Sequence, residues 1–198
     1  MAEYLSEGLM ERGHQVMVYS SHKHPYQEKE WKTVPIIHCY DPEYYMGTAG
    51  QFIYDLNCIM DARKRNFDII LMLGYTSSSV WKFLYPSKSI IISNMDGLEW
   101  SRAKYSKPVK RFLKYAEKLA VSSSHHHIAD SEVIKEYLDK KYGITSKYIA
   151  YGADLHHITD ERLLMEYDLI KKDYFVLMAR MEPENNIEML LDGFCLSN

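Results

Sequence analysis

The chain has 198 residues, of which 46% are hydrophobic and 26% are charged, so it can bury a core as one domain or as one domain and part of another. A formal net charge of -3 argues against nucleic acid as the main partner, and no apolar run approaches the roughly 20 residues of a membrane span. Cys39, Cys58 and Cys195 are scattered and lack a Cys-x-x-Cys spacing, which fits a reducing cytoplasm and no zinc site.

The first part of the chain predicts a helix followed by strands. A helical pattern precedes Gly13, which acts as a stop signal, and residues 16–19 predict a strand. Residues 22–31 are polar and predict a loop. Residues 34–40 predict an edge strand, because Pro35 cannot donate to a ladder and suits the start of such a strand. A helix follows, with expected core positions at Phe52, Leu56, Ile59 and Met60.

Residues 68–73 and 89–93 predict two buried strands. The second contains three consecutive isoleucines at 90–92, and a β-branched run of this kind suits a parallel strand that is covered on both faces. The loop after the first strand contains Tyr75 and small polar residues, but it has neither the G-x-G-x-x-G pattern nor the P-loop pattern. Support for a dinucleotide-binding site is therefore weak.

Polar side chains gather directly after the strand at 89–93. In open α/β sheets ligands bind beyond the carboxyl ends of the strands, so these side chains stand where binding groups usually stand. They are Asn94, Asp96, Glu99 and Trp100. The other interpretation is a polar turn whose Asp-Gly pair only reverses the chain. The spacing of the residues leaves both interpretations open.

A basic stretch runs from Ser101 to Lys118, and Pro108 within it suits the first turn of a helix. Apolar residues recur on one face of this predicted helix. Basic residues recur on another face, at Lys107, Arg111, Lys114 and Lys118. Two interpretations of the basic face are open: a solvated surface, or a surface that docks on anionic lipid headgroups.

Residues 126–129 and 147–150 predict two further strands. The helix between them is expected to be capped by Asp130 or Ser131 and to end at Gly143. The first of these strands and this cap fit the strand-loop-helix repetition of an α/β domain.

Three adjacent histidines at 125–127 raise the question of a metal site. On a strand, His125 and His127 would share a face while His126 would point the other way. No matching carboxylate or cysteine motif lies nearby, and the chain contains no Asp-x-Asp, the usual handle for a metal-bound diphosphate. We therefore expect no bound metal.

A second α/β pattern starts near the end of the chain. Residues 174–180 predict a strand, and Arg180 at its end stands just before a helix that Asn185 or Asn186 opens. The free amides of such a helix start attract phosphate. Two nearby glutamates, Glu182 and Glu184, would repel an anion, so we expect them to face sugar hydroxyls instead. The other interpretation is that Asn186 is only an N-cap and Arg180 only part of a surface ion pair.

These segments together carry a family resemblance. YFVLMARMEPENNIEMLLDGF resembles the opening strand, loop and helix of the nucleotide-binding domain of family-4, GT-B glycosyltransferases. NMDGLEW, IADS and YGAD, in this order, resemble the acceptor-side domain of the bacterial rhamnosyltransferase-like branch of that family. The likeness covers nearly all of residues 1–194.

The resemblance implies an α/β fold with a Rossmann-like acceptor-side domain at 1–155, in which helices cover both faces of a mainly parallel sheet. A connection at 156–172 would contain a short helix capped by Thr159, and 173–198 would be the first strand and helix of a truncated, Rossmann-like nucleotide-sugar-binding domain. The family's first strand would precede this chain, and the paired glutamates that hold the donor sugar would follow it. We therefore expect the 198-residue chain alone to be inactive.

The resemblance also implies a function: retaining transfer of a sugar, with rhamnose as a candidate, from a nucleoside diphosphate sugar to a saccharide on polyprenyl diphosphate. This would be a step of surface polysaccharide synthesis that uses no metal and no other cofactor. Arg180 matches the family's diphosphate-binding arginine, whereas Asn185 and Asn186 stand where many relatives have a lysine. The enzyme would be cytoplasmic, and its basic helix would hold it at the inner face of the plasma membrane.

On the acceptor side, Asp96 is the catalytic candidate, and we expect it to position the acceptor hydroxyl. Its expected neighbours are Tyr75, Asn94 and Glu99, with Trp100 as a platform for sugar stacking. Two alternatives stay open. A GT-B nucleotide-sugar 2-epimerase shares the architecture, although the basic helix and NMDGLEW speak against it. A module that binds the lipid-linked saccharide or a partner without catalysis would need no donor site.

Overall fold

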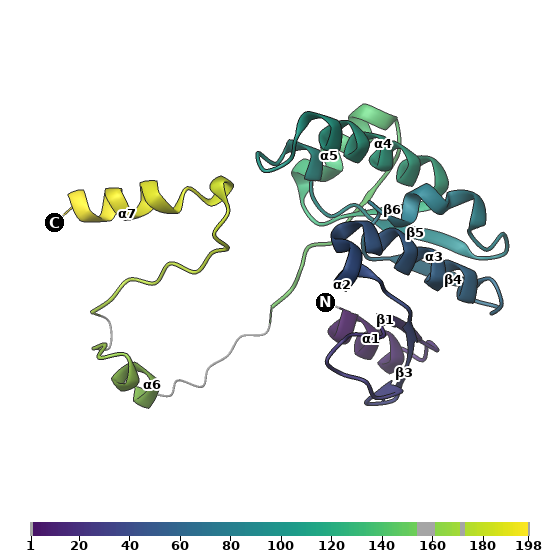
Figure 1. The fold of residues 1–198 in the computed structure, drawn as a ribbon, viewed down its shortest axis with the longest axis horizontal. Coiled ribbons are helices and arrows are strands. Elements are labelled where there is room, and N and C mark those ends of the chain that lie inside the picture. The colour runs from purple at the N-terminus through teal and green to yellow at the C-terminus, as the bar shows by residue number, and fades with distance from the viewer. Residues whose placement is uncertain (1, 154–160, 171–172, 198) are drawn as a thin grey trace.

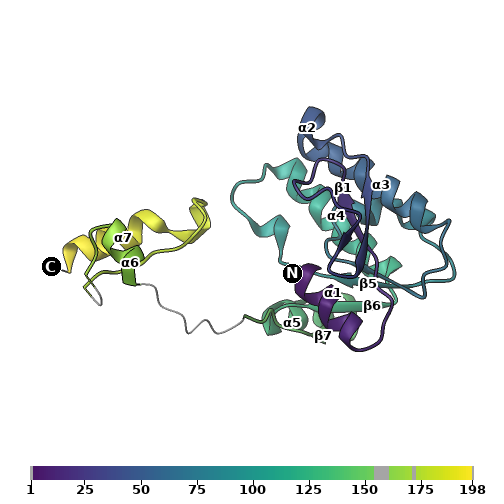
Figure 2. The same cartoon turned by 90° about the horizontal axis from the view of Figure 1, so that it is seen from below.

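The computed structural model describes residues 2–153, 161–170 and 173–197, and for Glu161, Leu163 and Glu184 it describes the backbone only. Figures 1 and 2 show that the elements up to residue 153 lie together and that α6 and α7 lie apart from them. The first group contains α1 (Ala2–Glu11), β1 (Val18–Ser21), β2 (Glu30–Trp31), β3 (Val34–Cys39), α2 (Glu43–Met46), the 3-10 helix η1 (Gly47–Ala49), α3 (Gly50–Ala62), β4 (Ile69–Met72), the 3-10 helix η2 (Ser78–Leu84), β5 (Ile90–Asn94), the 3-10 helix η3 (Glu99–Ser101), α4 (Lys107–Ser123), β6 (His126–Ala129), α5 (Glu132–Tyr142) and β7 (Lys147–Tyr148). The second group contains α6 (Glu161–Glu166), the 3-10 helix η4 (Pro183–Asn185) and α7 (Ile187–Leu196).

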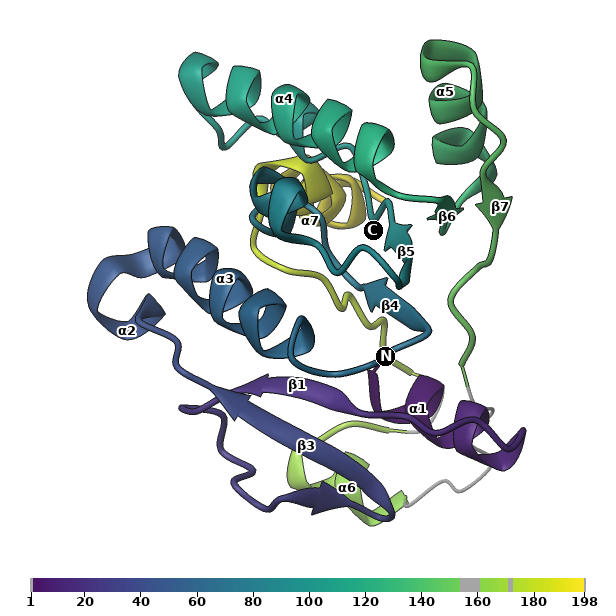
Figure 3. The same cartoon turned by 90° about the vertical axis from the view of Figure 1, so that its right-hand side faces the viewer.

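The strands form two sheets, with the orders β1-β3-β2 and β4-β5-β6-β7. All pairs in the second sheet are parallel, as is β1 with β3, while the short β2 pairs antiparallel with β3. Helix α4 packs against β5, and α5 packs against β6 and β7, as Figure 3 shows. The predicted Rossmann-like α/β class, with a mainly parallel sheet flanked by helices, is confirmed.

Two predictions about the first sheet are wrong. We expected β3 at an edge because of Pro35, but β3 lies between β1 and β2. Pro35 is tolerated because it pairs with Glu30 at the end of the two-residue strand β2, where few ladder hydrogen bonds are required. The loop predicted at 22–31 therefore ends in a strand, which is too short to have a hydrophobic period.

No strand pairing joins β1 to β4 within residues 2–153, so both are edge strands of their sheets. Side chains connect the two sheets instead. The hydroxyl of Tyr19 on β1 donates to Asp61 on α3 over 2.8 Å, and its ring meets Phe67 edge-on just before β4. Because β4 has no neighbour on that side, Ile69 is 55% exposed although its sequence predicts a buried strand.

The hydrophobic core lies behind the carboxyl ends of β5 and β6. Met95, Ala129 and Leu138 are each no more than 1% exposed and belong to one buried cluster with Tyr75 and Ala120. Burying apolar area of this kind is the main favourable contribution to folding. The residues that directly follow the two strands are therefore attached to the most rigid part of the domain.

The helix boundaries follow the sequence signals closely. Helix α4 has Pro108 in its first turn, and α5 is capped by Ser131, whose Oγ accepts from the amide of Ile134 over 3.2 Å. Gly143 ends α5 in a left-handed conformation with φ of 65°, which glycine adopts without strain. The core face predicted for α3 is wrong at Met60, which is 42% exposed, and right at Ile59, which is 4% exposed.

The last part of the chain departs most from the prediction. The expected helices are present as α6 and α7, but the described residues 173–180 form no strand. A strand requires a hydrogen-bonding neighbour, and the described part of the chain places none beside this segment, so Phe175, Val176 and Met178 are 85%, 75% and 93% exposed. Thr159, expected to cap α6, lies outside the described residues.

The two neighbouring isoleucines Ile90 and Ile91 provide a direct test of this core. Ile91→Ala should lower the free energy of unfolding by about 3 kcal/mol, because its side chain is only 1% exposed and its loss leaves a cavity. Ile90→Ala removes the same atoms from a side chain that is 42% exposed and should cost less than about 1 kcal/mol. Urea denaturation followed by circular dichroism measures both, and equal losses would contradict the burial described above.

Candidate functional site

The parallel strands β4, β5 and β6 end at one edge of the sheet, and three loops begin there. Asp96 follows the buried Met95 after β5, and Asp130 follows the buried Ala129 at the end of β6. The backbone amide of Met95 donates to the carbonyl of Ile128 over 2.8 Å, which extends the pairing to the loop itself. Both aspartates are thus held at the position where open α/β sheets bind ligands.

Asp96 and Asp130 are neighbours at this edge, close enough for the charge of Asp96 to act on Asp130. Asp96 is exposed, while Asp130 is half-buried and its Oδ1 has no hydrogen-bond partner in the described part of the chain. Burial and the neighbouring Asp96 carboxylate raise the pKa of Asp130 above its ordinary value. Two carboxyl groups of this kind can accept hydrogen bonds from a hydroxyl. We predicted only Asp96, because IADS was interpreted as a helix cap, a role that Ser131 takes.

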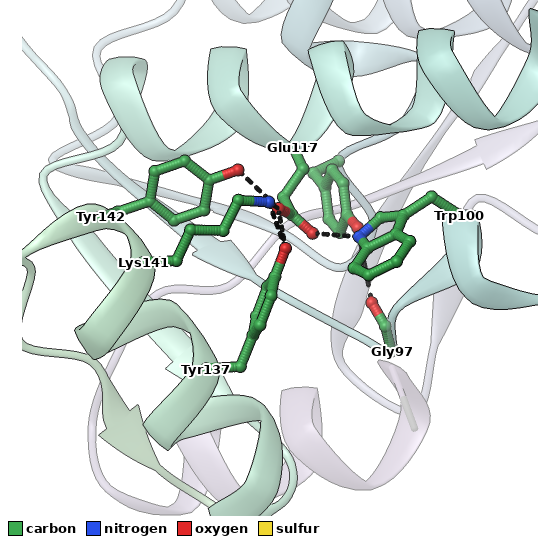
Figure 4. Close-up of polar contacts among 7 residues, drawn as sticks. Gly97, Trp100, Glu117, Tyr137, Lys141 and Tyr142 are labelled. Carbon is green, nitrogen blue, oxygen red and sulfur yellow. Dashed lines mark hydrogen bonds and ion pairs between the residues drawn. The ribbon is translucent and has the colours of Figure 1, made fainter.

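A buried carboxylate behind the loop organises this region (Figure 4). Glu117 on α4 is 1% exposed, and its Oε2 accepts from the indole Nε1 of Trp100 over 2.9 Å. Its Oε1 accepts from three groups on α5: the hydroxyl of Tyr137 at 2.8 Å, the ammonium of Lys141 at 2.8 Å and the hydroxyl of Tyr142 at 2.5 Å. One side chain therefore joins the loop after β5 to α4 and α5.

The network fixes the ionisation of its members. Burial by itself would raise the pKa of the Glu117 carboxyl, but the hydrogen bonds from Lys141, Tyr142, Tyr137 and Trp100 outweigh burial and lower it. Burial and the bond to Glu117 raise the pKa of Tyr142 to about 12. Glu117 is therefore an anion and Tyr142 a neutral donor at neutral pH.

Glu117 was not among the predicted site residues. It is the one acid in the basic stretch from Ser101 to Lys118. A signal was nevertheless present, because Glu117 falls in the same helical stripe as the buried residues Leu113, Ala116 and Ala120. An acid in an apolar stripe predicts a buried carboxylate that needs partners.

The predicted neighbours of Asp96 are held by contacts within the protein. Tyr75 is 4% exposed, and its hydroxyl donates to the carbonyl of Gly97 over 3.4 Å. Asn94 is buried and donates to the hydroxyl of Tyr151 over 3.3 Å. Gly97 has φ of 74°, a conformation that strains any other residue, so the turn in NMDGLEW requires glycine.

Glu99 and Trp100 are also engaged. Glu99 forms an ion pair with Arg102 at 2.9 Å and accepts from the hydroxyl of Tyr105 at 3.3 Å. The indole ring of Trp100 has the ammonium of Lys114 at 4.4 Å from its centroid, a cation–π contact. These contacts fix both side chains on the loop, and the role of Trp100 as a sugar-stacking platform stays a prediction.

The basic face predicted on α4 forms as expected. All four of its side chains are exposed, and none forms an ion pair within the described part of the chain. They are Lys107, Arg111, Lys114 and Lys118. No helix among the described residues is long and apolar enough to cross a membrane.

On the predicted donor side, the structure brings Arg180 and Asn185 into contact, whereas Glu182 pairs with a residue outside this segment. Arg180 is exposed, and its carbonyl accepts from the side-chain amide of Asn185 over 2.7 Å. Helix α7 begins after Asn186, which has a left-handed conformation with φ of 49°. The side chain of Glu184 lies outside the described residues, and Glu182 pairs with Lys104 at 2.9 Å.

Metal-ligating side chains do not gather in the described ranges, where no group of three or more His, Cys, Asp or Glu could hold an ion. His127 is buried and bonds the carbonyl of Val121 at 3.1 Å, while His125 Nδ1 accepts from the amide of Ile91 at 2.9 Å. Both histidines therefore have structural partners at the amino end of the sheet, away from Asp96.

Fold and edge geometry define a Rossmann-like α/β domain with candidate binding groups at the carboxyl ends of its parallel strands. A family model matches residues 16–154, and the chain belongs to that family, which is described as "Domain of unknown function (DUF1972)". A search of curated proteins finds no match to this chain.

Glu117→Gln should test whether the buried anion stabilises the domain. The substitution keeps the shape but leaves Lys141 without a charged partner, so we expect a loss of about 3 kcal/mol in unfolding free energy at pH 7. Folding lowers the pKa of the Glu117 carboxyl. Its contribution to stability is therefore present above the pKa of the unfolded chain, about 4.3, and is lost as the pH falls through the pKa of the folded state.

Urea titrations at pH 7 and pH 3 measure this difference. Glu136→Gln on α5 is the matched control, because its pair with Lys140 is exposed and its loss should leave the stability nearly unchanged. If Glu117→Gln lowers the unfolding free energy by the same amount at pH 3 and at pH 7, the side chain stabilises the domain through its shape and not through its charge.

Proposed function

We propose that the chain is the acceptor-side part of a retaining glycosyltransferase. The complete enzyme would move a sugar, with rhamnose as a candidate, from a nucleoside diphosphate sugar to a lipid-linked saccharide in surface polysaccharide synthesis. The observation that carries the proposal is the carboxylate of Asp96, exposed beside Asp130 at the carboxyl edge of a parallel sheet. The family match over residues 16–154 spans NMDGLEW, IADS and YGAD, the same motifs that carry the resemblance.

The acceptor hydroxyl requires an oriented hydrogen-bond acceptor. Asp96 can take this role because it is exposed while the backbone beside it is anchored by Met95 and Gly97. A rigid backbone is what makes positioning effective, since small displacements of a reacting group are costly in rate. Asp130 lies within reach as a second carboxyl group, and Glu117 holds the far side of the loop through Trp100.

The leaving diphosphate requires positive charge and hydrogen-bond donors. Arg180 and the backbone amides in the first turn of α7 can supply them. The donor is then a substrate that binds opposite Asp96, and the site requires no metal or other cofactor. The basic face of α4 would hold the enzyme at an anionic membrane surface, where a lipid-linked acceptor resides.

A non-catalytic binding module is the second candidate. The observation that favours it is the segment 173–180, which is exposed and forms no strand, so the donor half of a transferase is incomplete in the described residues. Calorimetry separates the two proposals. A transferase should bind the nucleotide and the acceptor, whereas a binding module should bind only the acceptor.

Asp96→Asn keeps the shape of the side chain and removes its charge. In the complete enzyme we expect turnover to fall about tenfold or more, with nucleotide affinity nearly unchanged, because Asp96 orients the acceptor and not the donor. Arg180→Ala should weaken nucleotide binding as well as rate. Wild-type turnover of Asp96→Asn at saturating acceptor would leave Asp96 as a turn residue only.

The membrane role of α4 can be tested with vesicles. Reversing the charges of Lys107, Arg111 and Lys118 should abolish sedimentation with anionic vesicles at low salt, because each basic residue near such a surface contributes about 1 kcal/mol. The matched control reverses three exposed lysines elsewhere, at Lys64, Lys88 and Lys140. Equal sedimentation of both triple variants would show that α4 is only a solvated surface.

A further inference from the structure

An ion pair connects the loop ahead of α4 with the candidate donor segment. The ammonium of Lys104 lies 2.9 Å from Oε1 of Glu182, although the two residues are 78 positions apart in the sequence. Glu182 stands two positions after Arg180, and Lys104 stands between the acceptor-side loop and the basic helix. The contact therefore brings one cation from the acceptor side to the proposed diphosphate site.

The surroundings of Glu182 are strongly positive. The hydrogen bond from Lys104 lowers the pKa of Glu182, and the charges of Arg180 and Arg102 act in the same direction. Arg102 is held by Glu99 at 2.9 Å, whereas Lys104 has Glu182 as its carboxylate partner. Lys104 is thus the cation in direct contact with Glu182, and Arg180 and Arg102 act on it through their charge.

An exposed pair of this kind exchanges easily. The side chains of Lys104 and Glu182 are 32% and 28% exposed, and a surface ion pair of this kind contributes little stability. A diphosphate has more negative charge and more acceptor oxygens than a carboxylate, so it can replace Glu182 as the partner of Lys104. When no diphosphate is bound, the carboxylate of Glu182 pairs with the ammonium of Lys104.

We propose that Lys104 is a second ligand of the donor diphosphate, acting from the acceptor side together with Arg180, and that Glu182 is an internal competitor which the diphosphate displaces. This inference rests on the proposed function, because it takes Arg180 as part of the donor site. In this proposal Glu182 pairs with Lys104 and does not bind the sugar hydroxyls that its position in the sequence suggested.

The experiment measures binding of inorganic pyrophosphate to the 198-residue chain by calorimetry at low ionic strength. Lys104→Met should weaken binding about tenfold, as expected for loss of a charge-assisted hydrogen bond. Glu182→Gln should strengthen binding about threefold, because the competitor is removed. Lys64→Met, which removes an exposed lysine shortly after α3, is the matched control and should leave the affinity unchanged.

The double variant Lys104→Met with Glu182→Gln distinguishes a ligand from a neutralising charge. If Lys104 contacts the anion, it should bind about tenfold more weakly than Glu182→Gln alone. Equal affinity of the double variant and Glu182→Gln would mean that Lys104 only neutralises Glu182, and would overturn the inference.

Arg180→Ala separates this inference from the proposed function. Weaker binding by Arg180→Ala with no effect of Lys104→Met would refute the inference and support the donor site. An effect of Lys104→Met alone would remove Arg180 from the site, against the proposed function. Absence of pyrophosphate binding by both the wild type and Glu182→Gln would refute both.

Discussion

The carboxylate of Glu117 is the interaction on which the rest of the candidate site depends. It is almost fully buried, and a buried carboxylate without partners is strongly unfavourable, so its four donors must stay in place for the domain to fold. Those donors come from the loop after β5 and from α5. The position of the loop that carries Asp96 therefore follows from a requirement of folding, and a ligand need not order it.

The same network connects the edge of the sheet to the surface of α4. Trp100 donates to Glu117 and also lies under the ammonium of Lys114, one of the four exposed bases of the basic face. Acidic groups thus gather at the carboxyl edge and basic groups on the adjoining helix and loop. This division suits a neutral hydroxyl at Asp96 and an anion beside Lys104 and Arg180, because each would meet the group that complements it.

Much of the first domain could be predicted from its sequence, because its signals are local. The β-branched run at 90–92, the cap at Ser131 and the stop at Gly143 each determine their own conformation. Asp96 was found because it follows a strand whose type was clear. Asp130 and Glu117 were missed as site residues because their environment depends on side chains far away in the sequence.

The segment 173–180 shows the opposite limit. Its residues favour a strand, but a strand forms only where another strand can pair with it. The sequence of the segment does not show whether such a partner is present. The edge position of β4 has the same origin, since exposure of Ile69 depends on what lies beside the sheet.

The central claim is that the carboxyl edge of the sheet binds a saccharide acceptor. Amide NMR spectra of the chain, titrated with a short-chain polyprenyl diphosphate saccharide, test this most directly. If this edge is the acceptor site, the largest shifts should cluster at residues 95–100 and 130–131, whereas a nucleoside diphosphate should shift residues around 180–187. Saturable acceptor binding that leaves 95–100 and 130–131 unchanged would show that the saccharide binds elsewhere.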